Sequence, residues 1–302
     1  MAERKNWQVL LAVDGSVYSD VAMKLMTMMP WPVETQATVL AVAPERWSLL
    51  GLSAEIQRDL VQMMATLDPV DMAAARYLTE RVAAALAEHG LSAASEVRKG
   101  KPAEEILKHA ATLPADLIAI GAKGLCAPSD FMLGSTAYKV AQYADCSVLV
   151  VRPPKRAHIV SVILAADGSP DAERVAELLC ALSLPRWAEI IVVSVAEVAI
   201  GILAGGKRPV ADVPEPVRRA LLDVAAARAD AVVAMLRQCG ANVRSAVRIG
   251  HPVQEILLAA KEHDADLIAI GARGQTHTET FRLGGVAQKV VKYAPCSVLV
   301  GR

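Results

Sequence analysis

The sequence predicts an α/β protein of two tandem, doubly wound domains, each a parallel sheet with helices on both faces. Short apolar runs that end at turns alternate with segments of helical periodicity throughout the 302 residues. The same series of segments occurs twice, in the same order. The apolar runs are nearly continuous, as expected for strands that a parallel sheet buries on both faces.

Four pairs of closely similar segments define the repeat. They are LLAVDGS at 10–16 and ILAADGS at 163–169, RKGKPAEEIL at 98–107 and RIGHPVQEIL at 248–257, LIAIGAKG at 117–124 and LIAIGARG at 267–274, and CSVLV at 146–150 and 296–300. A period of about 150 residues is too long for a solenoid and indicates one duplicated domain. Pro153 and Pro154 at the join disfavour both helix and central strand. The predicted domains are therefore residues 1–153 and 157–302.

The elements of the first half follow from apolar runs and from helix start and stop signals. Strands are expected at 9–13, 37–43, 92–98, 117–120 and 147–151, and helices at 17–29, 53–89, 102–112 and 135–143. The first helix stops before Pro30, and Gly90 ends the second. The second helix is expected to be interrupted near Asp68-Pro69, and Pro102 suits the first turn of the third.

The second half repeats this pattern, with strands expected near 159–165, 189–195, 242–248, 267–270 and 297–300. Strands that alternate with helices are joined by right-handed crossovers. Such crossovers place the strands parallel to one another, which completes the α/β prediction.

Composition and charge exclude several classes of protein. The 32 Lys and Arg residues balance the 32 Asp and Glu residues, and a zero net charge argues against a dedicated nucleic-acid binder. A hydrophobic content of 54% argues against disorder. The sequence has no uncharged apolar run of ~18 residues that would span a membrane. Its charged start also lacks the apolar region of a secretory leader.

Cysteines and histidines carry little sign of a site. The five cysteines form no CxxC pair, and their odd, scattered number predicts reduced thiols and a cytoplasmic location. The six histidines show no HExxH or HxH spacing, so no metal site is expected.

Glycines and small polar residues follow the strands at the edge where an open parallel sheet binds its ligands. Asp14 follows the first strand, and the fourth strand leads into Gly121-x2-Gly124-x9-Gly134-Ser135. Glycines allow close backbone approach, and the amides that open the next helix can hold an anion. The pattern is neither a Walker A motif nor a GxGxxG fingerprint. It predicts a phosphate cradle of another kind.

This motif, the aspartate after the first strand and the closing CSVLVVR resemble the universal stress protein family over both halves of the chain. The resemblance implies five-stranded parallel sheets of order 3-2-1-4-5 that bind ATP, alone or with Mg²⁺. It implies pairing through the last strand, so that the two halves form a pseudo-dimer, and a homodimer is a further expectation. The implied role is regulatory, in the stress response, with an unknown protein partner.

The resemblance also implies the residues of the nucleotide sites. In the first half Val13, Asp14, Val42, Ile120 and Gly121 would contact the adenosine, and Lys123, Gly124, Gly134, Ser135 and Thr136 would face the phosphates. The matching residues of the second half are Asp167, Val195, Ile270, Gly271, Arg273, Gly274, Gly284 and Gly285. Because Gly285-Val286 replaces the two hydroxyl residues there, the first half is expected to bind ATP better. Arg273 could offset part of that loss.

Structural interpretations compete with this assignment. Asp14 and Asp167 could cap the next helix or form a turn, the glycines could be turn residues, and Lys123 could be a solvated loop charge. Two other functions also stay open. A slow ATP hydrolase would need carboxylates such as Asp130 or Glu279. A scaffold that binds no nucleotide would need none of these residues. No catalytic residue is assigned.

Overall fold

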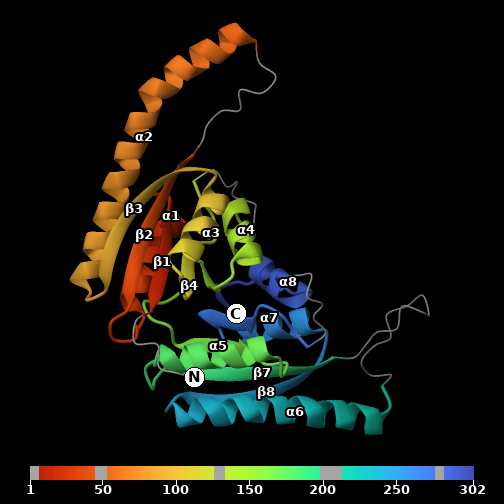
Figure 1. The fold of residues 1–302 in the computed structure, drawn as a ribbon. Coiled ribbons are helices and arrows are strands. Elements are labelled where there is room, and N and C mark those ends of the chain that lie inside the picture. Colours follow the sequence, from red (N-terminus) through yellow and green to blue (C-terminus); the bar gives the residue numbers. More distant parts are fainter. Residues whose placement is uncertain (1–6, 45–52, 126–132, 198–212, 276–281) are drawn as a thin grey trace. The chain divides into compact units, whose positions relative to one another are not determined.

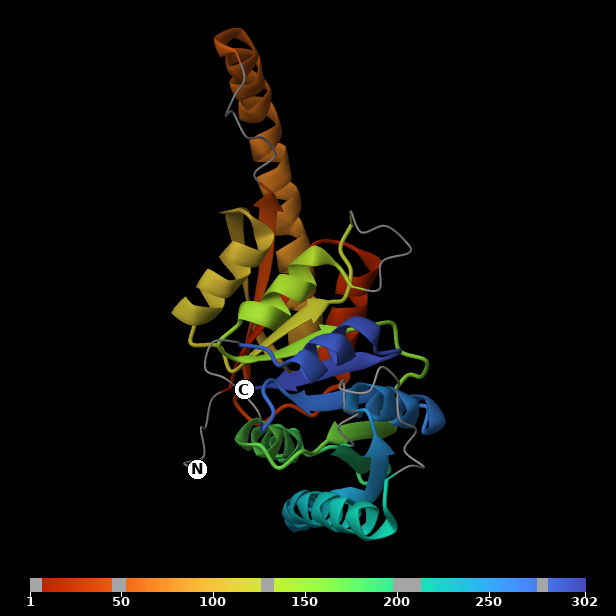
Figure 2. The ribbon, with the colours of Figure 1, turned by 90° about the vertical axis from the view of Figure 1, so that its right-hand side faces the viewer.

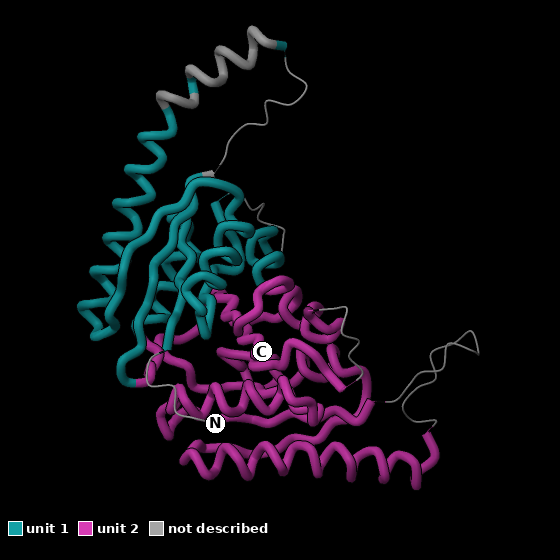
Figure 3. The backbone as a smooth tube through the Cα atoms, viewed as in Figure 1, with its two compact units in different colours: residues 1–27, 33–140 teal, residues 28–32, 141–302 magenta. Residues whose placement is uncertain are grey.

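The computed structural model describes residues 7–44, 53–125, 133–197, 213–275 and 282–302, although part of the long helix at 54–66 is described by its backbone alone. The chain divides into two compact units. Unit 1 comprises residues 1–27 and 33–140, and unit 2 comprises residues 28–32 and 141–302 (Figure 3). Each unit is a layered α/β structure. The predicted domain division at 153–157 stays a prediction.

Unit 1 contains four parallel strands in the order β3-β2-β1-β4. The strands are β1 (Gln8–Val13), β2 (Gln36–Pro44), β3 (Ser92–Gly100) and β4 (Leu117–Gly121), and the helices are α1 (Val17–Met28), α2 (Ala54–Glu88), α3 (Pro102–Thr112) and α4 (Ser135–Tyr143). The chain passes from β1 to β2 to β3 in one direction across the sheet and then returns to the other side of β1 to form β4. Right-handed crossovers therefore place α2 and α3 on opposite faces of the sheet. Figure 1 and the turned view in Figure 2 agree with this placement.

Unit 2 contains the complete second copy. Its strands are β5 (Ser147–Val151), β6 (Ser161–Ala165), β7 (Glu189–Glu197), β8 (Asn242–Gly250), β9 (Leu267–Gly271) and β10 (Ser297–Gly301), and its helices are α5 (Pro170–Ala181), α6 (Glu215–Gln238), α7 (Pro252–Glu262) and α8 (Gly285–Tyr293). The order β8-β7-β6-β9-β10 is the predicted order 3-2-1-4-5, which is thereby confirmed. The strands β5, β6, β9 and β10 are entirely buried, β7 is mostly buried, and the edge strand β8 is partly exposed.

The fifth strand of the first copy, β5, belongs to unit 2 because it pairs antiparallel with β10. Two arginines bracket this pair. The Arg152 guanidinium donates to the Val291 carbonyl (2.6 Å), and the Arg302 guanidinium donates to the carbonyls of Ala141 (2.6 Å) and Cys146 (3.1 Å). We call this arrangement the arginine clasp. It satisfies carbonyls near the C-terminal ends of α4 and α8, where a helix leaves its last carbonyls without partners.

The long helix α2 corrects one prediction. It runs from Ala54 to Glu88 with Pro69 inside it, so the expected interruption near Asp68-Pro69 is wrong. A proline removes one intrahelical hydrogen bond and bends a helix, but it need not end one when the flanking residues favour the helix. Beside the proline, the Asp68 carboxylate pairs with the Lys99 amine at the end of β3.

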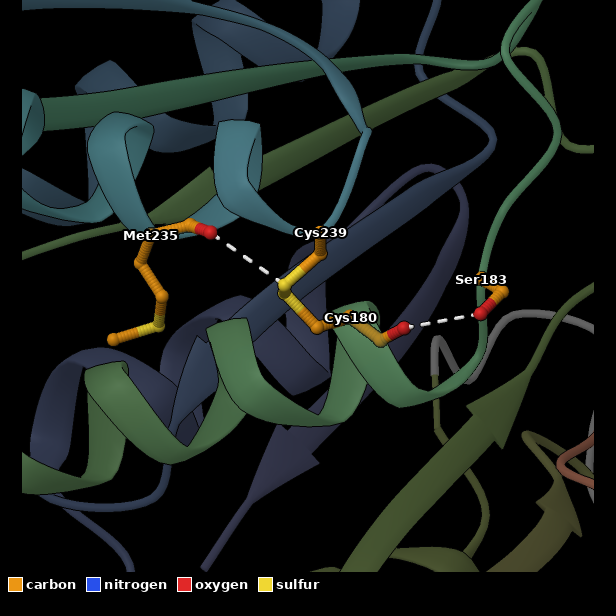
Figure 4. Close-up of a disulfide and its surroundings, with 4 residues drawn as sticks. All are labelled: Cys180, Ser183, Met235 and Cys239. Carbon is orange, nitrogen blue, oxygen red and sulfur yellow. Dashed lines mark hydrogen bonds between the residues drawn. A yellow bond between two sulfur atoms is a disulfide. The ribbon is translucent and has the colours of Figure 1, made fainter.

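A disulfide joins Cys180, in the last turn of α5, to Cys239, which follows α6 (Figure 4). The prediction that the cysteines are reduced thiols is therefore wrong for this pair. Fifty-nine positions separate the two residues in sequence, yet their Cα atoms lie 5.6 Å apart. Of the other thiols, Cys296 is buried, and this burial raises its pKa to about 12.

No helix among the described residues is long and apolar enough to cross a membrane.

Candidate functional site

The carboxyl ends of three strands meet at one edge of the unit 1 sheet. Ala12 of β1 lies opposite Ile120 of β4, and Val13 lies opposite Ala41 of β2. Val13 and Ile120 are buried, and Val42 is half-buried. These three residues, all predicted to contact adenosine, therefore lie on neighbouring strands at one edge of the sheet, and all three are apolar.

Asp14 connects the two loops at this edge. One carboxylate oxygen accepts a hydrogen bond from the Ser16 amide (3.0 Å), and the other accepts one from the Leu125 amide (3.1 Å). The Ser16 hydroxyl accepts from the Ser19 amide (3.2 Å), so Ser16 caps α1. The alternative that Asp14 caps this helix is wrong, whereas its role in the turn is confirmed.

Glycine is required where the loops meet. A Cβ atom on Gly124 would lie 2.6 Å from the Asp14 carboxylate, and one on Gly121 would lie 2.8 Å from the carbonyl carbon of Tyr18. These distances are shorter than the contacts that real Cβ atoms make. The two glycines therefore let α1 and the Asp14 carboxylate come directly against the loop after β4.

Lys123 lies between these glycines. Its amine is 5.8 Å from the centre of the Tyr18 ring, within the range of a cation–π contact. Its backbone carbonyl lies 3.4 Å from the Ser16 hydroxyl, which donates to it. Lys123 is thus half-buried against α1 rather than a fully solvated loop charge.

The loop returns to the sheet at Gly134, whose amide donates to the Ala122 carbonyl (2.7 Å). This amide therefore closes the loop and does not donate to a ligand. The Gly134 carbonyl accepts the first bond of α4, so Ser135 and Thr136 occupy the first helical turn. The amides of that turn have no intrahelical acceptor and are suited to hold an anion. Residues 126–132, including Asp130, lie outside the described residues.

We call this group of Asp14, Gly121, Lys123, Gly124 and Gly134, with the first turn of α4, the first cradle. The second cradle is its counterpart in unit 2: Asp167, Gly271, Arg273, Gly274 and Gly284, with the first turn of α8.

The second cradle repeats the backbone construction of the first. Asp167 accepts hydrogen bonds from the amides of Ser169 (3.0 Å) and Gln275 (3.3 Å), and the Gly284 amide donates to Ala272 (2.7 Å). Ser169 caps α5, so Asp167 does not. Ile270 pairs with Ala165 at the same sheet edge, and Val195 lies near the end of β7. Gly285 opens α8, and Glu279 lies outside the described residues.

The two cradles differ at the loop cation. The Arg273 guanidinium binds the Asp171 carboxylate through Nε (2.8 Å) and Nη2 (3.2 Å), and the Arg273 amide binds the same carboxylate (3.0 Å). The hydrogen bonds and the negative charge of Asp171 raise the pKa of Arg273. Arg273 is therefore directed toward α5, so the expectation that it compensates for the missing hydroxyls finds no support.

The sequence analysis missed Asp171, although a signal for it exists. When DGSVYSD at 14–20 is aligned with DGSPDAE at 167–173, Asp171 stands where the first copy has Tyr18. A carboxylate that replaces an aromatic residue beside a loop cation predicts an ion pair.

The described residues contain no cluster of three or more His, Cys, Asp or Glu side chains that could hold a metal ion. The expectation that the chain has no metal site stays a prediction.

Comparison with known proteins relates both halves of the chain to one family. The sequence model of the universal stress protein family matches residues 7–152 and 160–302. A universal stress protein of Mycolicibacterium smegmatis is 26% identical over 305 residues, covering 97% of this chain and 96% of the relative. Universal stress protein YxiE of Bacillus subtilis is 28% identical over 149 residues, covering 48% of this chain and 98% of its own.

A solved structure supports the fold. The crystal structure of a universal stress protein from Archaeoglobus fulgidus DSM 4304 aligns over 98% of both chains, with a TM-score of 0.57 and 20% identity.

Proposed function

Because the chain belongs to the universal stress protein family, with the family's domain occurring twice, we propose that it is a regulatory protein of the stress response that binds ATP in its first cradle. The observation that carries this proposal is the position of Asp14. Its carboxylate ties the loop after β1 to the loop after β4, directly against Gly124. This arrangement holds the two loops together at the sheet edge that we assign to the nucleotide.

The residues present fit an adenine nucleotide with its phosphates. The half-buried Val42 offers apolar surface to a base and ribose, next to the buried Val13 and Ile120. Ser135 and Thr136 add hydroxyl donors to the amides that open α4. Lys123, whose Cα would lie 3.3 Å from a Cβ on Gly134, brings a positive charge to the same loop. Mg²⁺ could accompany the phosphates as a counter-ion, and the nucleotide would act by preferring one conformation or partner over another.

ATP binding by the full chain tests the proposal. The variant Ser135→Gly/Thr136→Val gives the start of α4 the residues that open α8. We expect it to weaken ATP binding roughly ten- to a hundredfold for each hydroxyl that donates to a phosphate, because a hydrogen bond to a charged group contributes about 1.5–3 kcal/mol. Adenosine, which lacks phosphates, should bind the variant as it binds the parent chain. Isothermal titration with both ligands measures this difference.

The matched control is Gly285→Ser, which has room because a Cβ there meets nothing within 4 Å. It should leave ATP binding in the first cradle unchanged. Equal losses of ATP and adenosine affinity in the Ser135→Gly/Thr136→Val variant would contradict a phosphate role. Failure of the parent chain to bind ATP at all would favour the scaffold that binds no nucleotide.

The proposal is for binding rather than turnover. A hydrolase needs a carboxylate that holds a metal and a group that positions water. We expect at most slow hydrolysis, measured as phosphate release from ATP by the full chain. Turnover far above slow background, abolished by Asp130→Ala, would replace this proposal with a hydrolase.

The proposed location is the cytoplasm, as the sequence predicts. The Cys180–Cys239 disulfide counts against it, because cytosolic thiols are usually kept reduced. The pseudo-dimer of the two halves and a homodimer of the chain also stay proposals. The antiparallel pairing of β5 with β10 supports the first of them.

A further inference from the structure

The second cradle contains a carboxylate that is nearly fully buried. Asp171, in the first turn of α5, is 3% exposed. It accepts hydrogen bonds from the amide and guanidinium of Arg273 and from the Arg174 guanidinium (3.2 Å). A carboxylate that satisfies a loop amide and a bidentate guanidinium makes the contacts that a bound phosphate would make.

The first cradle has a different chemistry at the same place. Tyr18 stands at the position of Asp171, and the Lys123 amine lies over its ring. A tyrosine ring attracts a cation weakly and carries no charge that competes with a phosphate. The loop cation therefore contacts a neutral ring in the first cradle and a carboxylate in the second.

A second contact joins the loop after β9 to helix α6. The Arg228 guanidinium on α6 donates to the Gln275 side chain (2.9 Å), and a Cβ on Gly168 would lie 3.0 Å from that side chain. In the first copy Leu125 and Leu78 stand at the positions of Gln275 and Arg228, and two leucines cannot form such a bond. The side chains of Arg273 and Gln275 are thus both bound within unit 2.

We propose that Asp171 acts as an internal anion that determines the specificity of the second cradle, which excludes a polyphosphate and takes a nucleoside without phosphates. Most of the adenosine contacts are retained, since Asp167, Val195 and Ile270 match their first-copy counterparts, while Ala166 replaces Val13. A phosphate would have to draw Arg273 away from Asp171, which would leave this buried carboxylate with only the Arg174 guanidinium beside a second anion. This inference rests on nucleotide binding in the first cradle.

The experiment compares ATP with adenosine on the full chain. Hydrogen exchange at residues 117–125 and 267–275 reports the two cradles separately. In the parent chain, ATP should protect only 117–125, and adenosine should protect both segments. Asp171→Asn keeps the shape of the side chain and removes its charge. We expect it to raise ATP affinity at 267–275 by about tenfold or more, since tenfold corresponds to the release of one charge-assisted contact.

The reciprocal variant, Tyr18→Asp, places the carboxylate beside Lys123 and should lower ATP affinity at 117–125 by a similar factor while adenosine binding is retained. It decides the question if Asp171→Asn does not fold. Protection of 267–275 by ATP in the parent chain, equal to that at 117–125, would overturn the inference and leave the proposed function standing. So would unchanged ATP binding in the variants. If ATP protects neither segment of the parent chain, the proposed function itself fails.

Discussion

Reduction of the Cys180–Cys239 disulfide is expected to lower the free energy of unfolding of unit 2 by about 4 kcal/mol. The bond closes a loop between residues 59 positions apart, and chain entropy assigns a stabilisation of about that size to such a loop. The bond joins the end of α5 to the end of α6, so its loss frees the segment between them, which includes β7, in the unfolded chain. A loss of this size corresponds to a fall in melting temperature on the order of 10 °C.

The measurement is thermal unfolding of the full chain with and without reductant, followed by hydrogen exchange in α5 and α6. Cys180→Ser should reproduce the reduced protein. The double variant Cys180→Ser/Cys239→Ser is the matched control, because reductant should then change nothing although Cys146 and Cys296 remain. Identical melting of the oxidised and reduced parent chain would refute the expected stabilisation.

Replacement of Gly121 by alanine should destabilise unit 1 strongly, with a loss of about 3 kcal/mol or more of unfolding free energy. The new Cβ would lie 2.8 Å from the carbonyl carbon and 2.9 Å from the carbonyl oxygen of Tyr18. Those atoms belong to the backbone of α1, so no side-chain rotation relieves the contact. Overpacking usually costs about 1–3 kcal/mol, and a backbone collision lies at the upper end.

Urea denaturation with ATP titration tests this prediction, since a shift of α1 also moves Tyr18 and the cap at Ser16. Gly271→Ala should behave alike, because its Cβ would lie 2.8 Å from the Ala172 amide. Gly285→Ala is the control with open space around it and should cost little. A Gly121→Ala variant as stable as Gly285→Ala would show that α1 adjusts freely.

The sequence was sufficient to predict the strands and the helices, because these depend on local periodicity and on a duplication visible in the residues. The strand order followed from the resemblance to the universal stress protein family. It was not sufficient for contacts between distant side chains. Nothing in the spacing of Cys180 and Cys239 indicates that α5 and α6 end side by side. The continuity of α2 through Pro69 likewise depends on the surrounding helix rather than on the proline alone.

The candidate site shows the same division. The motif located the glycines, and the structure adds the reasons for two of them: Gly124 leaves space for the Asp14 carboxylate, and Gly121 leaves space for the backbone of α1. The role of Arg273 was misjudged because its partner, Asp171, lies about a hundred positions earlier. An alignment of the two halves would have brought Asp171 to notice.

The arginine clasp determines how this chain can be divided. The sequence repeat suggests a cut near residue 157, but β5 lies on the other side of that cut from its partner β10. A fragment that begins at residue 157 would expose the edge of β10 and leave the Arg302 guanidinium without the carbonyls of Ala141 and Cys146. An open apolar edge pairs with any available strand, most simply the same edge of another fragment. Ligand binding measured on the separated halves would therefore be affected by their self-association, whereas a fragment that begins before α4 would retain the arginine clasp.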